Sequence, residues 1–243
     1  MNFKKYVSIG LSVCSIVTLS ACSDNDSNDS NDSNDEVTPE VITQSYELTL
    51  SNLSNNQPLS PLAVAIHGES YTAWTIGEES SLGLEKLAEE GDGTDFLIEA
   101  TDSGAYTTKA GAGLIFPGDS ETLDIESISS DDLKLTFASM FINTNDAFIG
   151  KKGLDLTSLD IGDEMTVLIP VYDAGTEANN ELSGTIPGPS DGGEGFNALR
   201  DDVNVVSRHP GVVTNEDGYA DSILDSSHRF DAPAAKLVLK RTQ

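Results

Sequence analysis

The sequence predicts an all-β protein, an antiparallel β-sandwich with one short helix and long loops. Apolar and polar residues alternate along several short segments, and this period of two is typical of half-buried strands. Glycine and proline, 21 and 9 of the 243 residues, separate these segments and indicate turns. About 200 residues follow Glu40, which suits one sandwich rather than two domains.

The expected strands can be placed in chain order. Around Leu48, apolar residues alternate with glutamate and threonine, and residues 123–126 and 133–137 repeat the pattern. Residues 165–171 form a more continuous apolar run, which predicts a central strand. Alternation returns at residues 235–240, which we expect to form the closing strand. Together these segments predict the two sheets of a sandwich.

The helical period occurs in a single segment, residues 78–90. Its apolar residues share one face, Ser80 is a candidate N-cap, and Gly91 follows as a stop signal. We therefore expect one short helix from Glu78 to Glu90. The residues of its apolar face are Leu84, Leu87 and Ala88.

The N-terminal residues resemble a bacterial lipoprotein signal. Lys4 and Lys5 precede an apolar run of about a dozen residues, which is shorter than the roughly 20 that span a bilayer. The run ends in Leu19-Ser20-Ala21-Cys22, which resembles a lipobox; an ordinary secretory peptide with a chance cysteine is the alternative. We expect cleavage of residues 1–21 and lipidation of Cys22. The chain would then contact a membrane through its lipid alone.

This signal implies a place in the bacterial cell envelope, either periplasmic or surface-exposed. Ser23 follows the cysteine where aspartate often marks inner-membrane retention, so we expect the outer membrane. Residues 23–36 repeat Asn-Asp-Ser with almost no apolar side chains, and this composition predicts a disordered tether over residues 22–43. The sandwich domain is expected to occupy residues 44–243.

Composition excludes several functions. Lysine and arginine number 13 against 41 aspartates and glutamates, giving a formal net charge of -28. This excess of acid argues against nucleic acid as a partner, because such binding depends on neutralising phosphates, and it attracts divalent cations. The two cysteines, Cys14 and Cys22, both lie outside the expected domain, so the domain can hold no disulfide and no cysteine-based metal site.

A loop near residue 175 carries candidate metal ligands. Asp173 and Glu177 stand four residues apart around Ala174-Gly175, a spacing that lets a tight turn aim both carboxylates inward. Hard oxygen ligands without cysteine suit calcium better than zinc or copper. Two other interpretations stay open: Asp173 as a turn aspartate bonded to its own backbone, and Asp146 as a loop acid in solvent.

Four segments, in order, resemble the spondin domain of F-spondin-type extracellular proteins. Residues 60–67 are similar to that family's opening strand, and residues 79–91 resemble its helix with the "Ala-Glu-x-Gly" ending. Residues 139–150 resemble its "Met … Asp-Trp-x-Val-Gly" block, and residues 169–177 resemble "Pro-Trp-Asp-Ala-Gly-Thr-Asp". The resemblance extends from about Tyr46 to Thr242.

The resemblance implies a β-sandwich with calcium bound in the loops at one end. The family's three carboxylate ligands transfer onto Asp146, Asp173 and Glu177. Glu177 stands where the family has aspartate, and Phe148 and Tyr172 stand near its usual tryptophans. The flexible shell of calcium accommodates the longer glutamate arm.

Two function classes follow. The favoured one is a binding or adhesion module without enzymatic activity, whose partner is an extracellular or envelope protein or a polysaccharide. The alternative is a periplasmic or surface hydrolase that uses paired carboxylates. Gly118-Asp119-Ser120 is similar to the nucleophile block of one esterase class, but it follows a turn proline and is better explained as a turn.

Overall fold

A computed structural model describes residues 42–243. Cys22, the signal peptide expected at residues 1–21 and all but the end of the tether expected at residues 22–43 lie outside the described residues. Within the described part, no helix is both long enough and apolar enough to cross a membrane.

The first sheet has four strands in the order β4-β1-β10-β7, all paired antiparallel. Side chains alternate between buried and more exposed positions along β1, β4 and β10, as the period-two pattern predicted. The sheet therefore has one face in the core and one face toward solvent. Its strands are β4 (Ser120–Ile128), β1 (Thr43–Asn52), β10 (Ala235–Arg241) and β7 (Glu164–Ile169).

The second sheet has six strands in the order β3-β2-β5-β6-β8-β9, again antiparallel throughout. Strands β2 and β8 are buried along their whole length, and β5 is buried beyond its first residue. Both faces of the middle of this sheet are therefore covered. Its strands are β3 (Thr107–Ala110), β2 (Ala63–His67), β5 (Lys134–Met140), β6 (Ala147–Asp155), β8 (Val171–Asp173) and β9 (Ser207–Arg208).

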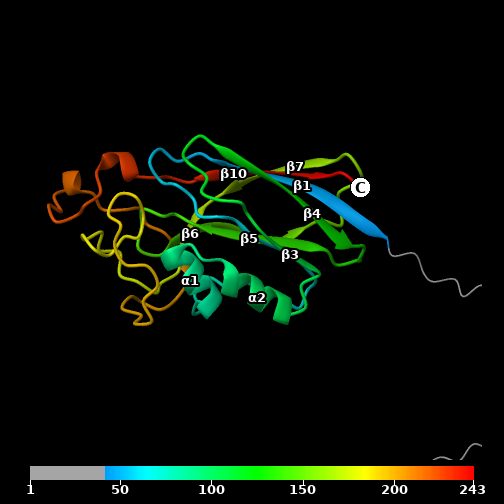
Figure 1. Ribbon diagram of the computed structural model, residues 1–243, viewed down its shortest axis with the longest axis horizontal. Coiled ribbons are helices and arrows are strands. Elements are labelled where there is room, and N and C mark those ends of the chain that lie inside the picture. Colours follow the sequence, from blue (N-terminus) through cyan, green and yellow to red (C-terminus); the bar gives the residue numbers. More distant parts are fainter. Residues whose placement is uncertain (1–41) are drawn as a thin grey trace, which may run out of the picture. The chain divides into compact units, whose positions relative to one another are not determined.

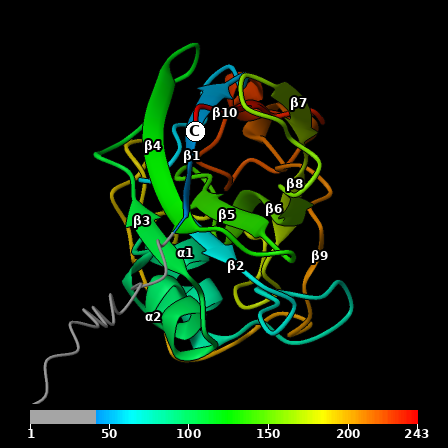
Figure 2. The same cartoon turned by 90° about the vertical axis from the view of Figure 1, so that its right-hand side faces the viewer.

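The molecule is layered, and Figure 2 shows the four-stranded sheet on one side of the six-stranded sheet and the helices on the other. The core between the sheets is formed by alternating side chains such as Leu48, Leu237 and Phe137. A second apolar cluster joins the helices to the outer face of the six-stranded sheet, where Ala65 and Ala138 are small enough for the helices to approach. These layers confirm the predicted all-β sandwich.

The helices differ from expectation. The first, α1 (Leu82–Glu90), begins later than residue 78, and Ser81 rather than Ser80 is its N-cap, accepting a bond from the amide of Leu84. Gly91 ends the helix as predicted, with a φ of 74°. The described residues contain a second α-helix, α2 (Thr94–Asp102), and two short 3-10 turns, η1 (Asn215–Asp217) and η2 (Ser226–His228).

The run at residues 165–171 is not one central strand. Residues 164–169 form β7 at the edge of the four-stranded sheet, and β8 begins at Val171 in the other sheet. Pro170 lies between them; since proline has no amide hydrogen to donate, it ends the first strand's pairing. The chain therefore passes from one sheet to the other at this residue.

Long loops gather at one end of the sandwich. Figure 1 shows the segments between β8 and β9 and between β9 and β10, yellow to orange, at the end away from the C-terminus. Asn145, Asp146 and Asp173 lie where β6 begins and β8 ends, at the base of these loops.

Candidate functional site

Strand pairing brings two of the predicted carboxylates together. Asp146 directly precedes β6, Asp173 ends β8, and Ala147 pairs with Asp173 across the antiparallel ladder. The amide of Ala174 then donates to the carbonyl of Asp146 at 3.2 Å. Glu177 follows in the next turn, and its own amide reaches the Asp146 carboxylate. The fold thus places Asp146, Asp173 and Glu177 in one site.

Asp146 is the centre of this site. It is fully buried, so it is not a loop acid in solvent. Its Oδ2 accepts hydrogen bonds from the amides of Thr176 (2.7 Å) and Glu177 (3.1 Å) and from the Thr176 hydroxyl (3.2 Å). Its Oδ1 is buried and has no partner among the described residues. One oxygen therefore shapes the turn while the other is left unsatisfied.

Asp173 is bonded on both carboxylate oxygens. Oδ1 accepts from the amide of Gly175 (2.7 Å), and Oδ2 accepts from the side-chain amide of Asn179 (2.6 Å). Asp173 is therefore a turn aspartate bonded to its own backbone, as one of the open interpretations held. Gly175 is required in this turn: its φ is +72°, and a Cβ there would lie 2.3 Å from the carbonyl of Val205.

Glu177 is buried without compensation. Its Oε2 has no hydrogen-bond partner among the described residues. Burial, and then the negative charges of Glu89 and Asp146, raise the pKa of its carboxyl group to about 9. Asp201 and Glu194 contribute in the same direction. Among the described residues, the charges that most affect Glu177 therefore all belong to carboxylates.

The same physics acts on the other two ligand candidates. Burial and then the charge of Asp173 raise the pKa of Asp146 to about 7. Burial also raises the pKa of Asp173, against the hydrogen bonds from Asn179 and Gly175. Since raised pKa values mean that the charged forms are disfavoured, ionising this site is opposed first by burial and, at Asp146, also by repulsion from Asp173.

Sequence reasoning missed Glu89. This residue stands in the last turn of α1 and is fully buried; its Oε2 accepts from the amide of Asn197 (2.9 Å), while its Oε1 has no partner among the described residues. Burial raises its pKa to about 7. It belongs to the "Ala-Glu-x-Gly" segment. The available signal was its position directly after Ala88, which the sequence places on the apolar face of the expected helix.

The donor set fits a hard divalent cation. Two of the orphaned oxygens, Asp146 Oδ1 and Glu177 Oε2, belong to predicted ligands and are carboxylate oxygens, the ligand type that calcium prefers. Within residues 42–243, however, no three Asp, Glu, His or Cys side chains converge closely enough as they stand to enclose a metal ion. A cation would have to draw these side chains together.

A small hollow adjoins this site. Its volume is about 100 Å³, and Glu177, Asn145, Glu194 and Asp201 are among its lining residues. Small-molecule sites usually measure about 300–1,000 Å³, so this space suits an ion with a few waters better than a sugar or peptide substrate.

The serine of the Gly118-Asp119-Ser120 segment and two buried histidines, His67 and His228, have structural roles. Ser120 begins β4, and its hydroxyl donates to Ser51 (2.8 Å). His67 is buried and bonded to the Gly68 carbonyl (2.7 Å) and the Thr136 hydroxyl (2.7 Å). His228 contacts Ser190 (2.7 Å) and Asp225 (3.0 Å) across neighbouring loops.

Fold and site together define an antiparallel sandwich module with an acidic loop end. Residues 50–185, more than half of the chain, match the family model described as Spondin_N, and the chain belongs to this family. No curated protein matches the chain. Membership indicates an extracellular module of the binding or adhesion type. The matched region contains Glu89, Asp146, Asp173 and Glu177.

Proposed function

We propose that this chain is an extracytoplasmic binding or adhesion module in which a calcium ion organises the loop end. The observation that carries the proposal is the pair of buried, unpartnered carboxylate oxygens on Asp146 and Glu177. A buried charge without a partner is costly, and a divalent cation between such groups removes that cost. The raised pKa values of Asp146 and Glu177 have the same cause.

Asp146, Asp173 and Glu177 would hold the ion. Calcium would supply positive charge and flexible coordination by six to eight oxygens. Asp146 already fixes the turn at Thr176, and Asp173 fixes the turn at Gly175, so both sides of the site are positioned by their own hydrogen bonds. Loops ordered in this way would present a fixed surface to a protein or polysaccharide partner in the envelope.

The test is thermal unfolding of chelator-treated protein as calcium is added. With Kd of about 10⁻⁴ to 10⁻³ M, 1 mM calcium should stabilise the domain by about 0.4 to 1.4 kcal/mol. That corresponds to a rise in Tm of about 1 to 6 °C for a domain of this size. Magnesium should do much less, because it gives up its waters reluctantly.

Variants locate the effect. Asp173→Asn should abolish the calcium shift, Asp146→Asn should weaken it strongly, and Glu177→Asp should retain it. Asp124→Asn is the matched control, since it removes one exposed carboxylate from β4 and should leave the shift unchanged. If calorimetry detects no calcium uptake at several millimolar and Asp173→Asn melts as the parent does, calcium is not a ligand of this protein.

The module would be held to the outer membrane by lipid on Cys22. Support comes from the lipobox-like segment and the short apolar run before it. Cys22→Ala should lose the lipid mass and either remain as unprocessed precursor or be released in soluble form, whereas Cys14→Ala should be processed like the parent. A mature parent chain of unlipidated mass would contradict the anchor.

The hydrolase alternative stays a prediction, and no observation favours it.

A further inference from the structure

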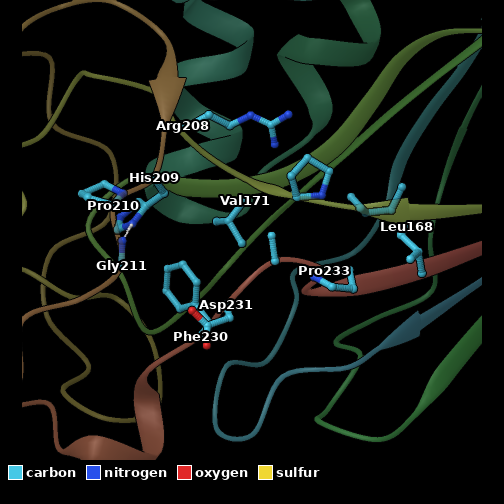
Figure 3. A pocket seen from close by; sticks show the side chains of 12 residues that line it. Leu168, Val171, Arg208, His209, Pro210, Gly211, Phe230, Asp231 and Pro233 are labelled. Atoms are coloured by element: carbon cyan, nitrogen blue, oxygen red, sulfur yellow. Dashed lines mark hydrogen bonds between the residues drawn. The ribbon is translucent and has the colours of Figure 1, made fainter.

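Two hollows adjoin the edge strands of the four-stranded sheet, β7 and β4. The first, beside Pro170 at the end of β7, measures about 630 Å³, and Figure 3 shows Pro210 and Pro233 among its lining residues. The second, which we call the β4 hollow, measures about 610 Å³ and is lined by residues 112–115 and 119–122. Proline has no amide hydrogen to donate, so the wall of the first hollow is a poor template for a further strand. The β4 hollow instead contains the start of a strand.

Strand β4 has one edge paired with β1 and one edge that faces away from its sheet. The amide of Ser45 in β1 donates to Gln243, on the β10 side (3.1 Å), and the amide of Asn52 donates to Asp119, on the β4 side (3.0 Å). Because bonding alternates along a strand, the even-numbered residues of β1 bond to β4, and the register makes the odd-numbered residues of β4 their partners. The amides and carbonyls of the even-numbered residues 120–126 therefore lie on the free edge of β4.

Side chains from β3 cover the later part of this free edge. The hydroxyl of Thr107 donates to the carbonyl of Glu126 (2.7 Å), and the ammonium of Lys109 donates to the carbonyl of Asp124. Cover of this kind prevents another chain from pairing with an exposed strand. The β4 hollow begins where β3 has ended, since its lining residues 112–115 follow that strand. The start of β4 therefore lacks the cover that its later part has.

Ser120 and Thr122 form the open part of the edge. Both are exposed, and among the described residues no hydrogen bond reaches their outward-facing amides and carbonyls. Their hydroxyls bond back to β1, Thr122 to Thr49 (2.8 Å) and Ser120 to Ser51 (2.8 Å). These hydroxyls therefore lie over the sheet and not across its free edge. Two such residues present donors and acceptors in the order that a further strand matches.

The surroundings of this open edge are acidic. Glu121 accepts from the amide of Ala112 with Oε1 (2.5 Å), while its Oε2 has no partner among the described residues. Asp119 is exposed and lines the same hollow, as does the exposed side chain of Leu114. None of the described residues that line the hollow is basic. A strand that pairs here would meet uncompensated carboxylates, so lysine or arginine is its complementary residue.

We propose that the β4 hollow docks an extended, basic segment of a partner protein, which adds a strand beside Ser120 and Thr122 and places a lysine or arginine at Glu121. Backbone hydrogen bonds to the edge would supply affinity, and the basic side chain would supply selectivity. A second copy of this chain is a poor occupant, because its own β4 would bring the same acids to this edge. The inference rests on the proposed binding role and needs none of the calcium ligands, which do not line the hollow.

The test titrates peptides into isotope-labelled full-length protein in the presence of a chelator, so that its outcome does not depend on calcium. The probe is acetyl-Thr-Lys-Thr-Lys-Thr-amide, whose two lysines share one face when the peptide is extended. Nuclear magnetic resonance should show saturable shifts of the Ser120 and Thr122 amides, with a Kd in the millimolar range that a few backbone hydrogen bonds supply. Replacing both lysines with glutamate should weaken binding by about tenfold or more, as expected for a lost charge-assisted bond.

Two methylated probes distinguish strand addition from attraction between charges alone. One carries N-methyl groups on its threonines and the other on its lysines, and in an extended peptide these two sets of amides face opposite edges. One methylated probe should therefore lose binding, while the other should bind as the unmethylated peptide does. Equal binding by both methylated probes would overturn the proposal.

Variants locate the binding. Gly113→Trp should fill the hollow and abolish binding, because nothing lies within 4 Å of a Cβ at this position, and Gly113→Ala is the matched control that leaves the hollow open. Glu121→Gln should reduce the preference for the lysine probe over the glutamate probe, whereas Glu164→Gln, at an exposed acid of β7, should keep it. Unfolding midpoints equal to that of the parent are the folding control.

Three results would overturn the proposal. The first is that the lysine probe shifts neither the Ser120 nor the Thr122 amide at several millimolar. The second is that Gly113→Trp binds it as tightly as Gly113→Ala does. The third is a dimer of the parent that Gly113→Trp dissociates, which would assign this edge to a second copy of the chain. Calcium uptake is measured separately, so each of these results leaves the calcium proposal standing.

Discussion

Helix α1 carries two buried glutamates four residues apart whose surroundings differ sharply. Glu85 forms an ion pair with Arg200 through both carboxylate oxygens, at 2.9 Å to Nε and 2.6 Å to Nη2. Glu89, one turn later, has a backbone amide on one oxygen and no described partner on the other. The carboxylate of Glu85 therefore has an ion-pair partner, whereas that of Glu89 has none among the described residues.

The comparison teaches that burial alone does not explain the acidic site. Both glutamates are less than a tenth exposed, yet Arg200 forms an ion pair with Glu85 and lowers the pKa of Glu89 only as the smallest of its named influences, well behind burial. The chain therefore can neutralise a buried acid, and does so beside Arg200. At Glu177, by contrast, the charges that most affect the pKa all belong to carboxylates.

Removing Arg200 from its ion pair with Glu85 should change the stability most. Arg200→Met leaves Glu85 buried and unpaired and also removes the hydrogen bonds to Ser80 and Asn204. We expect a loss of about 3 kcal/mol in the free energy of unfolding, measured by urea denaturation at pH 7. The double variant Glu85→Met/Arg200→Met should recover most of it, because no charge remains buried. A single variant as stable as the parent would show that the pair contributes nothing.

Neutralising Glu89 should change the stability less, and in the opposite direction. Glu89→Gln keeps the shape of the side chain and removes a charge that forms no ion pair among the described residues. In chelator-treated protein at pH 8 we expect a gain of about 2 kcal/mol, whereas Glu85→Gln, the matched control on the same helix, should lose stability. If both substitutions destabilise equally, the two ends do not differ as described.

The pH dependence gives this prediction a second readout. The pKa of Glu89 in the folded protein is about 7, above its ordinary value of 4.5, so the folded state keeps a proton that the unfolded chain has lost. Its stabilising contribution is complete below about pH 4.5 and is lost as the pH rises through 7. The advantage of Glu89→Gln should therefore be present at pH 8 and absent at pH 4. An equal advantage at both values would assign it to packing.

Sequence predicts the four-stranded sheet better than the six-stranded one. Strands β1, β4 and β10 have one solvent face, and the period of two remains visible in them. In β5, Thr136 is buried as completely as Leu135. The alternating pattern therefore predicted the strand, but not that both of its faces are covered. Helix α2 was missed because Gly93 gives its start no side-chain cap and only Phe96 and Ala100 are buried.

The site divides along similar lines. Asp173 and Glu177 share one turn, and the pairing of β6 with β8 brings Asp146 near them, as the family blocks led us to expect, while their role as calcium ligands stays a prediction. Glu89 arrives from a helix, and only the packing of α1 against β5 and β6 places it there. The hollow beside Pro170 is lined by three distant segments, residues 168–171, 208–211 and 230–233, and no spacing within the sequence predicts that they meet.

The position of β1 has a mechanical consequence. This strand lies between β4 and β10, and its first residues bond to the last ones of the chain, with Ser45 N 3.1 Å from Gln243 O. The long loops lie at the opposite end of the sandwich (Figure 1). If these loops hold a partner, as we propose, tension between that partner and the residues preceding Thr43 acts along β1. Both ladders are then loaded in shear, so their hydrogen bonds must break together instead of opening one at a time.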